Sequence, residues 1–312
     1  MGLIEAVPNI SEGRRTDVID ALADTLEACV GVTLLDTSSD AAHNRTVFTL
    51  LGKPHPIKSA LIALFAAAIE QIDLRTHTGE HPRIGAVDVV PLVPLEPREM
   101  PNCVALARDL GIVVAKTFDL PVYLYESAAR TPDRGKLELI RRGGFEGLTQ
   151  KMLTRAWHPD FGPEQPHPSA GASAIGARRI LIAFNINLDS EDIDVAIQVA
   201  RAIRESNGGL QAVKAIGVRT SKSNLVQVSI NLVDYQRTPL SRVFKAVEYQ
   251  AHRLGVTIHN SEIIGLPPSD AISTEAIQSL KLTDFTSDDL LESRISRKVS
   301  PPVSRDRDHD LL

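Results

Sequence analysis

The residues best suited to acid-base chemistry lie in one segment, THTGEHPRIG at 76–85. A glycine on each side of its charged residues allows the backbone to approach a ligand closely. His81 can accept and return a proton near neutral pH, because an unperturbed histidine has a pKa of about 6.5. Glu80 or Asp88 would hold its imidazole in one tautomer. The competing interpretation is a loop histidine that makes only local hydrogen bonds, and the residues alone do not separate the two.

A metal site is the rival interpretation of this part of the chain. The side chains that supply ligand types are His43, His55, His77, His81, Asp36 and Asp40. His77 and His81 are four residues apart, as in zinc sites on helices, but Gly79 and Pro82 make a helix unfavourable there. We therefore expect no metal in the mechanism.

Polar side chains alternate with apolar ones on two strand-like segments of the second half. Asn185 and Asn187 must share one face of their strand, and Gln227, Ser229 and Asn231 share one face of theirs. Buried amides without partners are costly, so such rows are typical of a wall that faces a ligand. A strand face exposed to solvent is the alternative.

Basic residues near these segments are candidates for binding carboxylates, with arginine favoured for bidentate pairing. They are Arg45, Arg83, Arg178, Arg179, Lys214 and Arg219. Most single surface cations bind nothing specific, which is the alternative here. The glycines at 143–144 and 176 lack the spacing of phosphate or dinucleotide loops.

Composition excludes several classes of protein. The 312 residues carry a formal net charge of −5, which gives no general attraction to nucleic acid. No apolar run approaches the roughly 20 residues that cross a bilayer, and the first residues do not resemble a signal peptide. The two cysteines are too few for a disulfide framework and fit a reducing compartment. We expect a cytoplasmic protein that binds neither nucleic acid nor membranes.

Hydrophobic periodicity predicts the same order of elements twice. In the first half it predicts a strand at 3–10, a helix containing 18–29, a hairpin of 32–36 and 46–51, a helix at 57–69 and a strand at 87–93. In the second half it predicts a strand at 180–188, a helix at 193–203, strands at 212–218 and 225–233, a helix at 240–254 and a strand at 256–264.

This order indicates an α+β protein of two ferredoxin-like sandwiches with a ligand cleft between them. We expect an N-terminal subdomain at 1–172, a C-terminal subdomain at 173–296 and a disordered tail at 297–312. Helical segments within 98–158, together with the apolar run at 122–125, should pack against the first sandwich.

Several stretches together resemble the formiminotransferase domain of glutamate formimidoyltransferases. They are VPNISEG at 7–13, NRTV at 44–47, GEHPR at 79–83, PVYLY at 121–125, PDFGP at 159–163 and AFNINL at 183–188. The resemblance extends over about residues 3 to 290. It implies a homodimer that transfers a formimidoyl group from N-formimidoyl-L-glutamate to tetrahydrofolate in histidine degradation. It implies no cyclodeaminase activity, because the chain ends where the vertebrate fusion continues into that domain.

The resemblance also assigns roles to residues. It makes His81 catalytic, assisted by an acidic residue for which Asp40, Asp36 and Glu80 are the candidates. It places folate contacts in the segment that contains Asp160, Phe161, Gly162, Pro163 and Gly171, and the polar strand rows add Asn185, Asn187 and Asn231 as expected contacts. The expected contacts of the glutamyl substrate are Asn9, Arg45, Arg83 and Arg178. A glutamate N-formyltransferase, a folate-binding protein without turnover and a metal-dependent amidine hydrolase are the alternatives.

Overall fold

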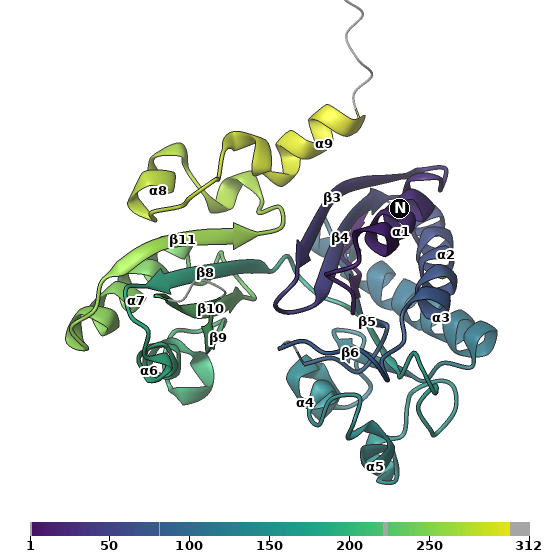
Figure 1. Cartoon of the computed structure of the whole chain (residues 1–312). Coiled ribbons are helices and arrows are strands. Elements are labelled where there is room, and N and C mark those ends of the chain that lie inside the picture. The colour runs from purple at the N-terminus through teal and green to yellow at the C-terminus, as the bar shows by residue number, and fades with distance from the viewer. Residues whose placement is uncertain (1, 81, 221–223, 300–312) are drawn as a thin grey trace, which may run out of the picture.

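The computed structural model describes residues 2–80, 82–220 and 224–299. Its helices and strands form two units, one around a seven-stranded sheet and one around a four-stranded sheet (Figure 1). The predicted α+β class is confirmed. Within the described residues, no helix is long and apolar enough to cross a membrane.

The first unit contains the following elements. They are β1 (Ile4–Ala6), β2 (Asn9–Ile10), α1 (Thr16–Glu27), β3 (Val32–Asp40), β4 (Arg45–Gly52), α2 (Pro54–Gln71), β5 (Val87–Pro94), α3 (Met100–Phe118), β6 (Val122–Glu126), α4 (Leu137–Arg141), α5 (Leu148–Met152) and β7 (Ser173–Ala177). The sheet runs β3, β4, β1 with β2, β5, β7 and β6. The predicted hairpin is β3 with β4, paired from Val32 opposite Gly52 to Asp40 opposite Arg45.

Helices α1, α2 and α3 cover one face of this sheet (Figure 1). Leu22, Leu64 and Phe48 are completely buried where the helices meet β4. Each large apolar side chain buried in this way contributes about 1.5–3 kcal/mol. Helices α4 and α5 cover only part of the opposite face, around Tyr123 and Leu148. The rest of that face carries Leu35 and Leu51, which belong to a separate small apolar cluster, and the buried carboxyl group of Glu5.

The second unit contains the predicted order of elements. They are β8 (Ile182–Leu188), α6 (Ile193–Ile203), β9 (Val213–Arg219), β10 (Val226–Leu232), α7 (Leu240–Arg253), β11 (Ile258–Ile264), α8 (Thr274–Ser279) and α9 (Leu291–Val299). The strands are antiparallel in the order β11, β8, β10, β9. Helices α6 and α7 share one core with this sheet. That either unit is ferredoxin-like stays a prediction from the order of its elements.

Strand β7 belongs to the first sheet, although we expected the second subdomain to begin at residue 173. It lies parallel to both β5 and β6 and inserts between them. Its five residues are all buried and show no polar alternation, so periodicity gives little sign of a strand there. We propose that the division between the units falls between Ala177 and Ile182. The run at 122–125, which we expected only to pack against the first sandwich, forms the edge strand β6 of its sheet.

Helix α9 crosses from the second unit onto β3 of the first (Figure 1). Leu291 and Ile295 pack with Leu35 in a small apolar cluster. The Nζ atom of Lys298 donates to the carbonyl oxygen of Leu34 at 2.6 Å. Residues 297–299 are therefore helical rather than part of a disordered tail, and the rest of the predicted tail lies outside the described residues.

A carboxyl group is buried in the sheet at Glu5, which is 6% exposed. Glu5 lies in β1 between Leu51 of β4 and Val93 of β5. Burial raises its pKa to about 7, and the positive charge of Arg178 opposes part of that rise. The folded chain therefore favours the neutral form of this side chain.

We expect Glu5→Gln to stabilise the protein more at high pH than at low pH. The unfolded chain ionises Glu5 around pH 4.5, whereas the folded chain does so at about 7. The stabilising effect of protonated Glu5 is therefore complete below pH 4.5 and is lost as the pH rises through 7. Urea unfolding should show a gain about 2 kcal/mol larger at pH 8 than at pH 5. Equal gains would contradict a neutral Glu5, and exposed Glu27→Gln is the control.

Candidate functional site

Three segments that are distant in the sequence meet beside the start of β5. They are the turn at 11–13 after β2, the β3–β4 turn at 40–45 and the loop at 76–85. The Oδ1 atom of Asn44 accepts from the Gly13 backbone at 2.9 Å, and its Nδ2 atom donates to the Thr78 carbonyl at 2.8 Å. Asn44 is 7% exposed and has a φ of 49°, a left-handed conformation that asparagine tolerates better than most residues. One buried amide thus joins all three segments.

His77 and Arg83 fasten the same loop. The Nε2 atom of His77 lies 3.0 Å from the carbonyl oxygen of Asn44, and the Arg83 Nε donates to His77 Nδ1 at 3.0 Å. Because Nδ1 accepts, the proton of the neutral ring lies on Nε2. Burial lowers the pKa of His77, and the charge of Arg83 lowers it further against the hydrogen bond to Asn44. His77 is therefore a neutral structural residue.

Arg83 makes four hydrogen bonds within the protein. Besides its bond to the His77 ring, its Nη2 atom donates to the His77 carbonyl oxygen at 2.9 Å. Its two Nη atoms also donate to the two carboxylate oxygens of Glu146, at 3.0 and 2.7 Å. The predicted role of Arg83 in substrate binding stays a prediction, while these contacts give it a structural role.

The glycines of the motifs permit close packing within the protein. A Cβ atom on Gly79 would lie 2.5 Å from the His43 carbonyl oxygen, and one on Gly13 would overlap the backbone of Asp40 and Arg45. In the structure, the backbones of the loop at 76–85 and of the turn at 11–13 approach the β3–β4 hairpin closely at these glycines.

Asp40 presents a carboxylate at the edge of this junction. It accepts hydrogen bonds from the backbones of Ala42 and His43 at 2.8 and 2.9 Å, and it pairs with the His43 ring at 2.5 Å. Burial alone would raise the pKa of Asp40, but these bonds outweigh it and lower the pKa below the usual value. The side chain is 48% exposed, so an ionised carboxylate faces solvent here. Exposed Glu80 lies next to it, with its backbone donating to Ala42 at 3.3 Å.

The predicted catalytic His81 lies outside the described residues. The residues on either side of it are fixed to the junction through the contacts of Glu80 and Arg83. Its proposed role stays a prediction.

Buried charges lie directly beneath the loop. The Oδ1 atom of Asp88 accepts from the Ile84 backbone at 2.7 Å, and its Oδ2 atom lies 2.5 Å from the Nη2 atom of Arg141 on α4. Both oxygens of Asp88, a candidate partner of His81, are thus engaged.

Burial and the nearby charge of Arg141 lower the pKa of Arg45 to about 10, against the attraction of Asp88 and Asp40. Sequence reasoning missed Arg141, whose short helix lies far from every motif used.

Asn9 and the predicted folate loop are also held by internal contacts. The Asn9 amide donates to the Val7 carbonyl at 2.8 Å. The Oδ2 atom of Asp160 accepts from the Leu124 backbone at 2.8 Å and pairs with Arg134 at 2.8 Å. The ring of Phe161 lies under the Arg130 guanidinium, 4.8 Å from it. Gly162 and Gly171 have φ values of 88° and 70°, which favour glycine. Folate contact by these residues and by Pro163 stays a prediction.

The amide rows of the second unit share the faces that alternation predicts. Gln227 donates to the Oδ1 atom of Asn187 at 2.9 Å, and Asn187 donates to Asn260 at 2.7 Å. Asn185 and Gln227 both donate to Glu262, at 3.2 and 3.1 Å. Asn231 is exposed on the same strand as Gln227. A polar network thus covers the sheet face opposite α6 and α7.

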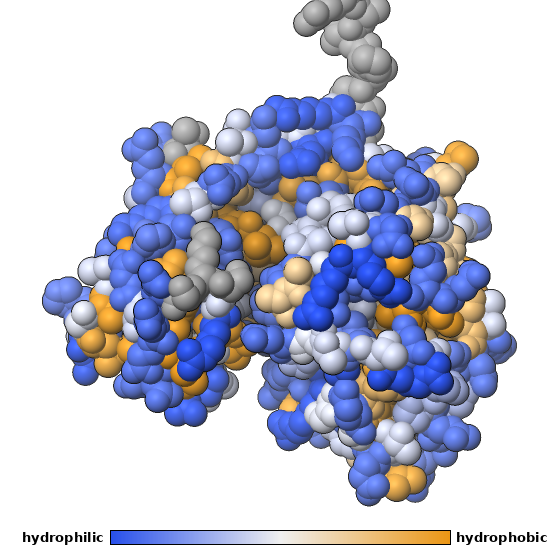
Figure 2. Space-filling model, viewed as in Figure 1, coloured by the Kyte–Doolittle hydropathy of each residue, from blue (hydrophilic) through white to orange (hydrophobic). Residues whose placement is uncertain are grey.

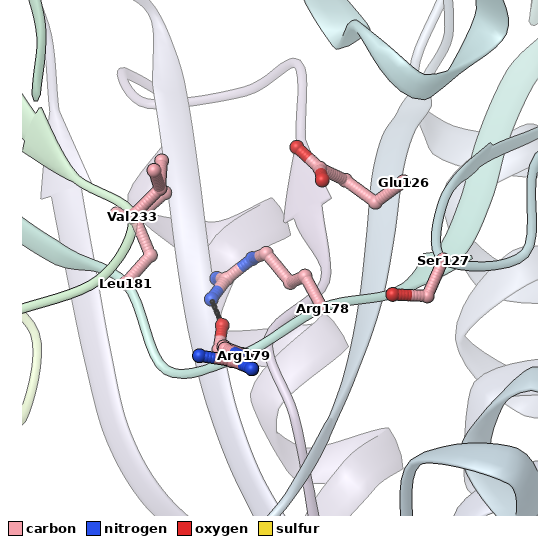
Figure 3. A pocket seen from close by; sticks show the side chains of 6 residues that line it. All are labelled: Glu126, Ser127, Arg178, Arg179, Leu181 and Val233. Carbon is pink, nitrogen blue, oxygen red and sulfur yellow. Dashed lines mark hydrogen bonds between the residues drawn. The ribbon is translucent and has the colours of Figure 1, made fainter. Parts of the chain in front are cut away.

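A small cavity lies where the two units join, and Figure 2 shows the units as two lobes with a hollow between them. The cavity encloses about 200 Å³ and is lined by Glu126, Ser127, Arg178, Arg179, Leu181 and Val233 (Figure 3). Arg178, a predicted substrate contact, extends across it and donates to the Arg179 carbonyl at 2.9 Å. This cavity lies at the far end of the strands from the loop at 76–85, beside Glu5.

Among the described residues, no three histidine, cysteine, aspartate or glutamate side chains are grouped so as to hold a metal ion. Two of the histidines considered as ligands bind protein groups instead: His43 pairs with Asp40, and His77 contacts Asn44 and Arg83.

Substitution of Asn44 should destabilise the junction in two separable steps. Asn44→Gly keeps the left-handed backbone but leaves the Gly13 amide without its buried acceptor, which should cost about 1–3 kcal/mol. Asn44→Ala adds a left-handed conformational cost of about 1–2 kcal/mol. Urea unfolding of both variants measures the two steps. Equal stability of Asn44→Ala and wild type would show that this amide does not hold the junction.

Comparison with known proteins connects this arrangement to a family. The model of the formiminotransferase domain, N-terminal subdomain, matches residues 3–178, and that of the formiminotransferase domain matches residues 183–290. The glutamate formimidoyltransferase of Streptococcus pyogenes serotype M1 is 43% identical over 91% of this chain and 95% of its own. That of Thermoplasma acidophilum is 42% identical over 96% and 99%.

Longer relatives match in the same region. The formimidoyltransferase-cyclodeaminase of Sus scrofa is 41% identical over 276 residues, which are 86% of this chain and 51% of the relative. This chain therefore spans about half of that protein. The two family models together with these identities cover both structural units, and the chain belongs to the formiminotransferase domain family.

Proposed function

We propose that the protein is a glutamate formimidoyltransferase, which transfers the formimidoyl group of N-formimidoyl-L-glutamate to tetrahydrofolate. The products are 5-formimidoyltetrahydrofolate and L-glutamate, in histidine degradation. The observation that carries this proposal is the identity of 42–43% to relatives of that name across nearly the whole chain. Tetrahydrofolate serves as the acceptor substrate, and no metal takes part. A cytoplasmic homodimer that binds neither nucleic acid nor membranes completes the proposal.

The reaction needs one proton acceptor that later becomes a donor. The N5 amine of tetrahydrofolate attacks the amidine carbon, and His81 accepts the proton lost from N5. The bond from carbon to the glutamate nitrogen then breaks, and His81 returns the proton to that nitrogen. Histidine suits both steps because its ordinary pKa is near neutral.

The donor is an amidine that carries a positive charge when protonated, so an ionised carboxylate near it stabilises the reacting group. Asp40 supports this role because its pKa is lowered and its carboxylate is half-exposed beside the loop. Glu80 is the second candidate, since it is exposed on the loop itself. We place the reaction at the edge of the junction formed by Asn44.

The proposed tetrahydrofolate site uses polar side chains of the second unit. The amide network of the second sheet lies on the face opposite α6 and α7. Amide groups recognise the hydrogen-bond donors and acceptors of a pterin without adding charge. We propose that Asn185, Asn187 and Asn231 take part in this binding.

An assay with two donors separates the proposed function from its alternatives. Purified protein is mixed with tetrahydrofolate and either N-formimidoyl-L-glutamate or N-formyl-L-glutamate, and the folate product is identified by mass. Formation of 5-formimidoyltetrahydrofolate supports the proposal. Transfer from the formyl donor alone would indicate a glutamate N-formyltransferase. Folate binding without product would indicate a binding protein, and amidine hydrolysis that needs no folate and stops with a chelator would indicate a metal-dependent hydrolase.

Replacing His81 tests the proton transfer. His81→Ala should lower kcat by about 10²- to 10⁴-fold, the usual contribution of a positioned acid-base group. The affinity for tetrahydrofolate should stay close to that of wild type, because this group acts mainly in the transition state. His55→Ala, on the exposed start of α2, is the matched control and should keep full activity. A near-normal kcat in His81→Ala would remove His81 from the mechanism.

A further inference from the structure

Arg141 makes fewer hydrogen bonds within the described residues than Arg83 or Arg134 does. Arg83 makes four hydrogen bonds to His77 and Glu146. Arg134 donates to two backbone carbonyls and pairs with Asp160. Arg141 has one ion pair, from Nη2 to Asp88, and neither its buried Nε nor its Nη2 makes a hydrogen bond among the described residues. The buried Nε of Arg134 also lacks an acceptor there, but its Nη atoms are bound.

The position of Arg141 is close to the loop that carries the proposed chemistry. Asp88 joins the two, because one of its oxygens accepts from the Ile84 backbone at 2.7 Å and the other pairs with Arg141 at 2.5 Å. The Arg141 side chain is 13% exposed, and that of Asp88 is 2% exposed. Arg141 is thus held in place from one side, and a guanidinium presents several more N–H donors in a fixed plane.

The local charge also favours an anion. The buried carboxylate of Asp88 pairs with Arg141, and the charges of Asp88 and Arg141 both act on the nearby guanidinium of Arg45. Two like charges close together in a buried place repel each other, and an additional anion at Arg141 would reduce that repulsion. Planar carboxylates pair with guanidinium in a bidentate way that no neutral ligand reproduces.

We propose that Arg141 binds a carboxylate of a glutamyl substrate and so sets specificity at this site. The proposal rests on the proposed function, since both of its substrates carry glutamyl carboxylates. The carboxylate comes either from N-formimidoyl-L-glutamate or from the glutamate of tetrahydrofolate. Arg141 acts beside the loop and from a different element than any arginine of the family motifs.

Truncated substrates identify the carboxylate. N-formimidoyl-4-aminobutyrate lacks the α-carboxylate of the donor, N-formimidoyl-L-2-aminobutyrate lacks the side-chain carboxylate, and tetrahydropteroate lacks the glutamate of the acceptor. Each is compared with its full substrate in wild type, Arg141→Gln and Arg142→Gln. Arg142 is the matched control, because it is the next residue and its side chain is exposed.

Arg141→Gln should raise KM for one full substrate by about 10- to 100-fold, the effect of a lost charge-assisted hydrogen bond. In wild type, removing this carboxylate from the substrate should raise KM. Arg141→Gln should lose most of this difference in KM between the full and the truncated substrate, whereas Arg142→Gln should keep it. Loss of this difference for a donor analogue assigns the carboxylate to the donor, and its loss for tetrahydropteroate assigns the carboxylate to the acceptor. Unchanged differences for all three analogues would overturn the proposal.

Arg141→Gln also leaves Asp88 without its ionic partner, which destabilises the fold. Arg141→Lys therefore serves as a second variant, because it keeps the positive charge for Asp88 but loses the planar fork. Arg141→Lys should raise KM for the same substrate by less than Arg141→Gln does. It should also reduce the difference in KM between that substrate and the same truncated analogue. Wild type that forms no 5-formimidoyltetrahydrofolate would instead contradict the proposed function, and direct binding of N-formimidoyl-L-glutamate to wild type and Arg141→Lys then tests Arg141 independently.

Discussion

The side chain of Asn44 satisfies backbone groups of two other segments while its own backbone is left-handed. A longer or apolar side chain at this position would leave the Gly13 amide and the Thr78 carbonyl without these partners. The β3–β4 hairpin brings Asn44 to the edge of the sheet, and the close contacts of Gly79 leave no room for a side chain there. These contacts hold Thr78 and Gly79 against the hairpin that carries Asp40, and the proposed chemistry depends on this placement.

Charge is distributed around this junction in two layers. Beneath the loop, Asp88 binds both Ile84 and Arg141, so the loop is tied to α4 as well as to the hairpin. At the edge, Asp40 keeps a low pKa through hydrogen bonds from the His43 backbone and ring. The buried layer connects the loop to α4, and the half-exposed carboxylate of Asp40 faces solvent. Charged residues near the junction, such as Arg83 and Asp40, therefore make contacts within the protein.

Hydrophobic periodicity predicted the hairpin, helices α2 and α7 and all four strands of the second sheet, because one face of each element is buried. It did not place β7 in the first sheet, since a fully buried strand shows no alternation. The sequence identified the motifs only as separate stretches, and the structure shows that Asn44, Gly13 and Thr78 from three of these segments meet through hydrogen bonds. Arg141 was not predicted, because a single arginine on a short helix carries no pattern.

Hydrogen exchange with and without 5-formyltetrahydrofolate, which already carries a one-carbon group on N5, tests most directly whether the Asn44 junction faces the folate. Exchange should become slower at 13–15, 40–45 and 76–80, with the amide of Glu80, bonded to Ala42, among the most affected. Protection confined to the cavity at 126–127 and 178–181, with no change in the junction, would contradict it.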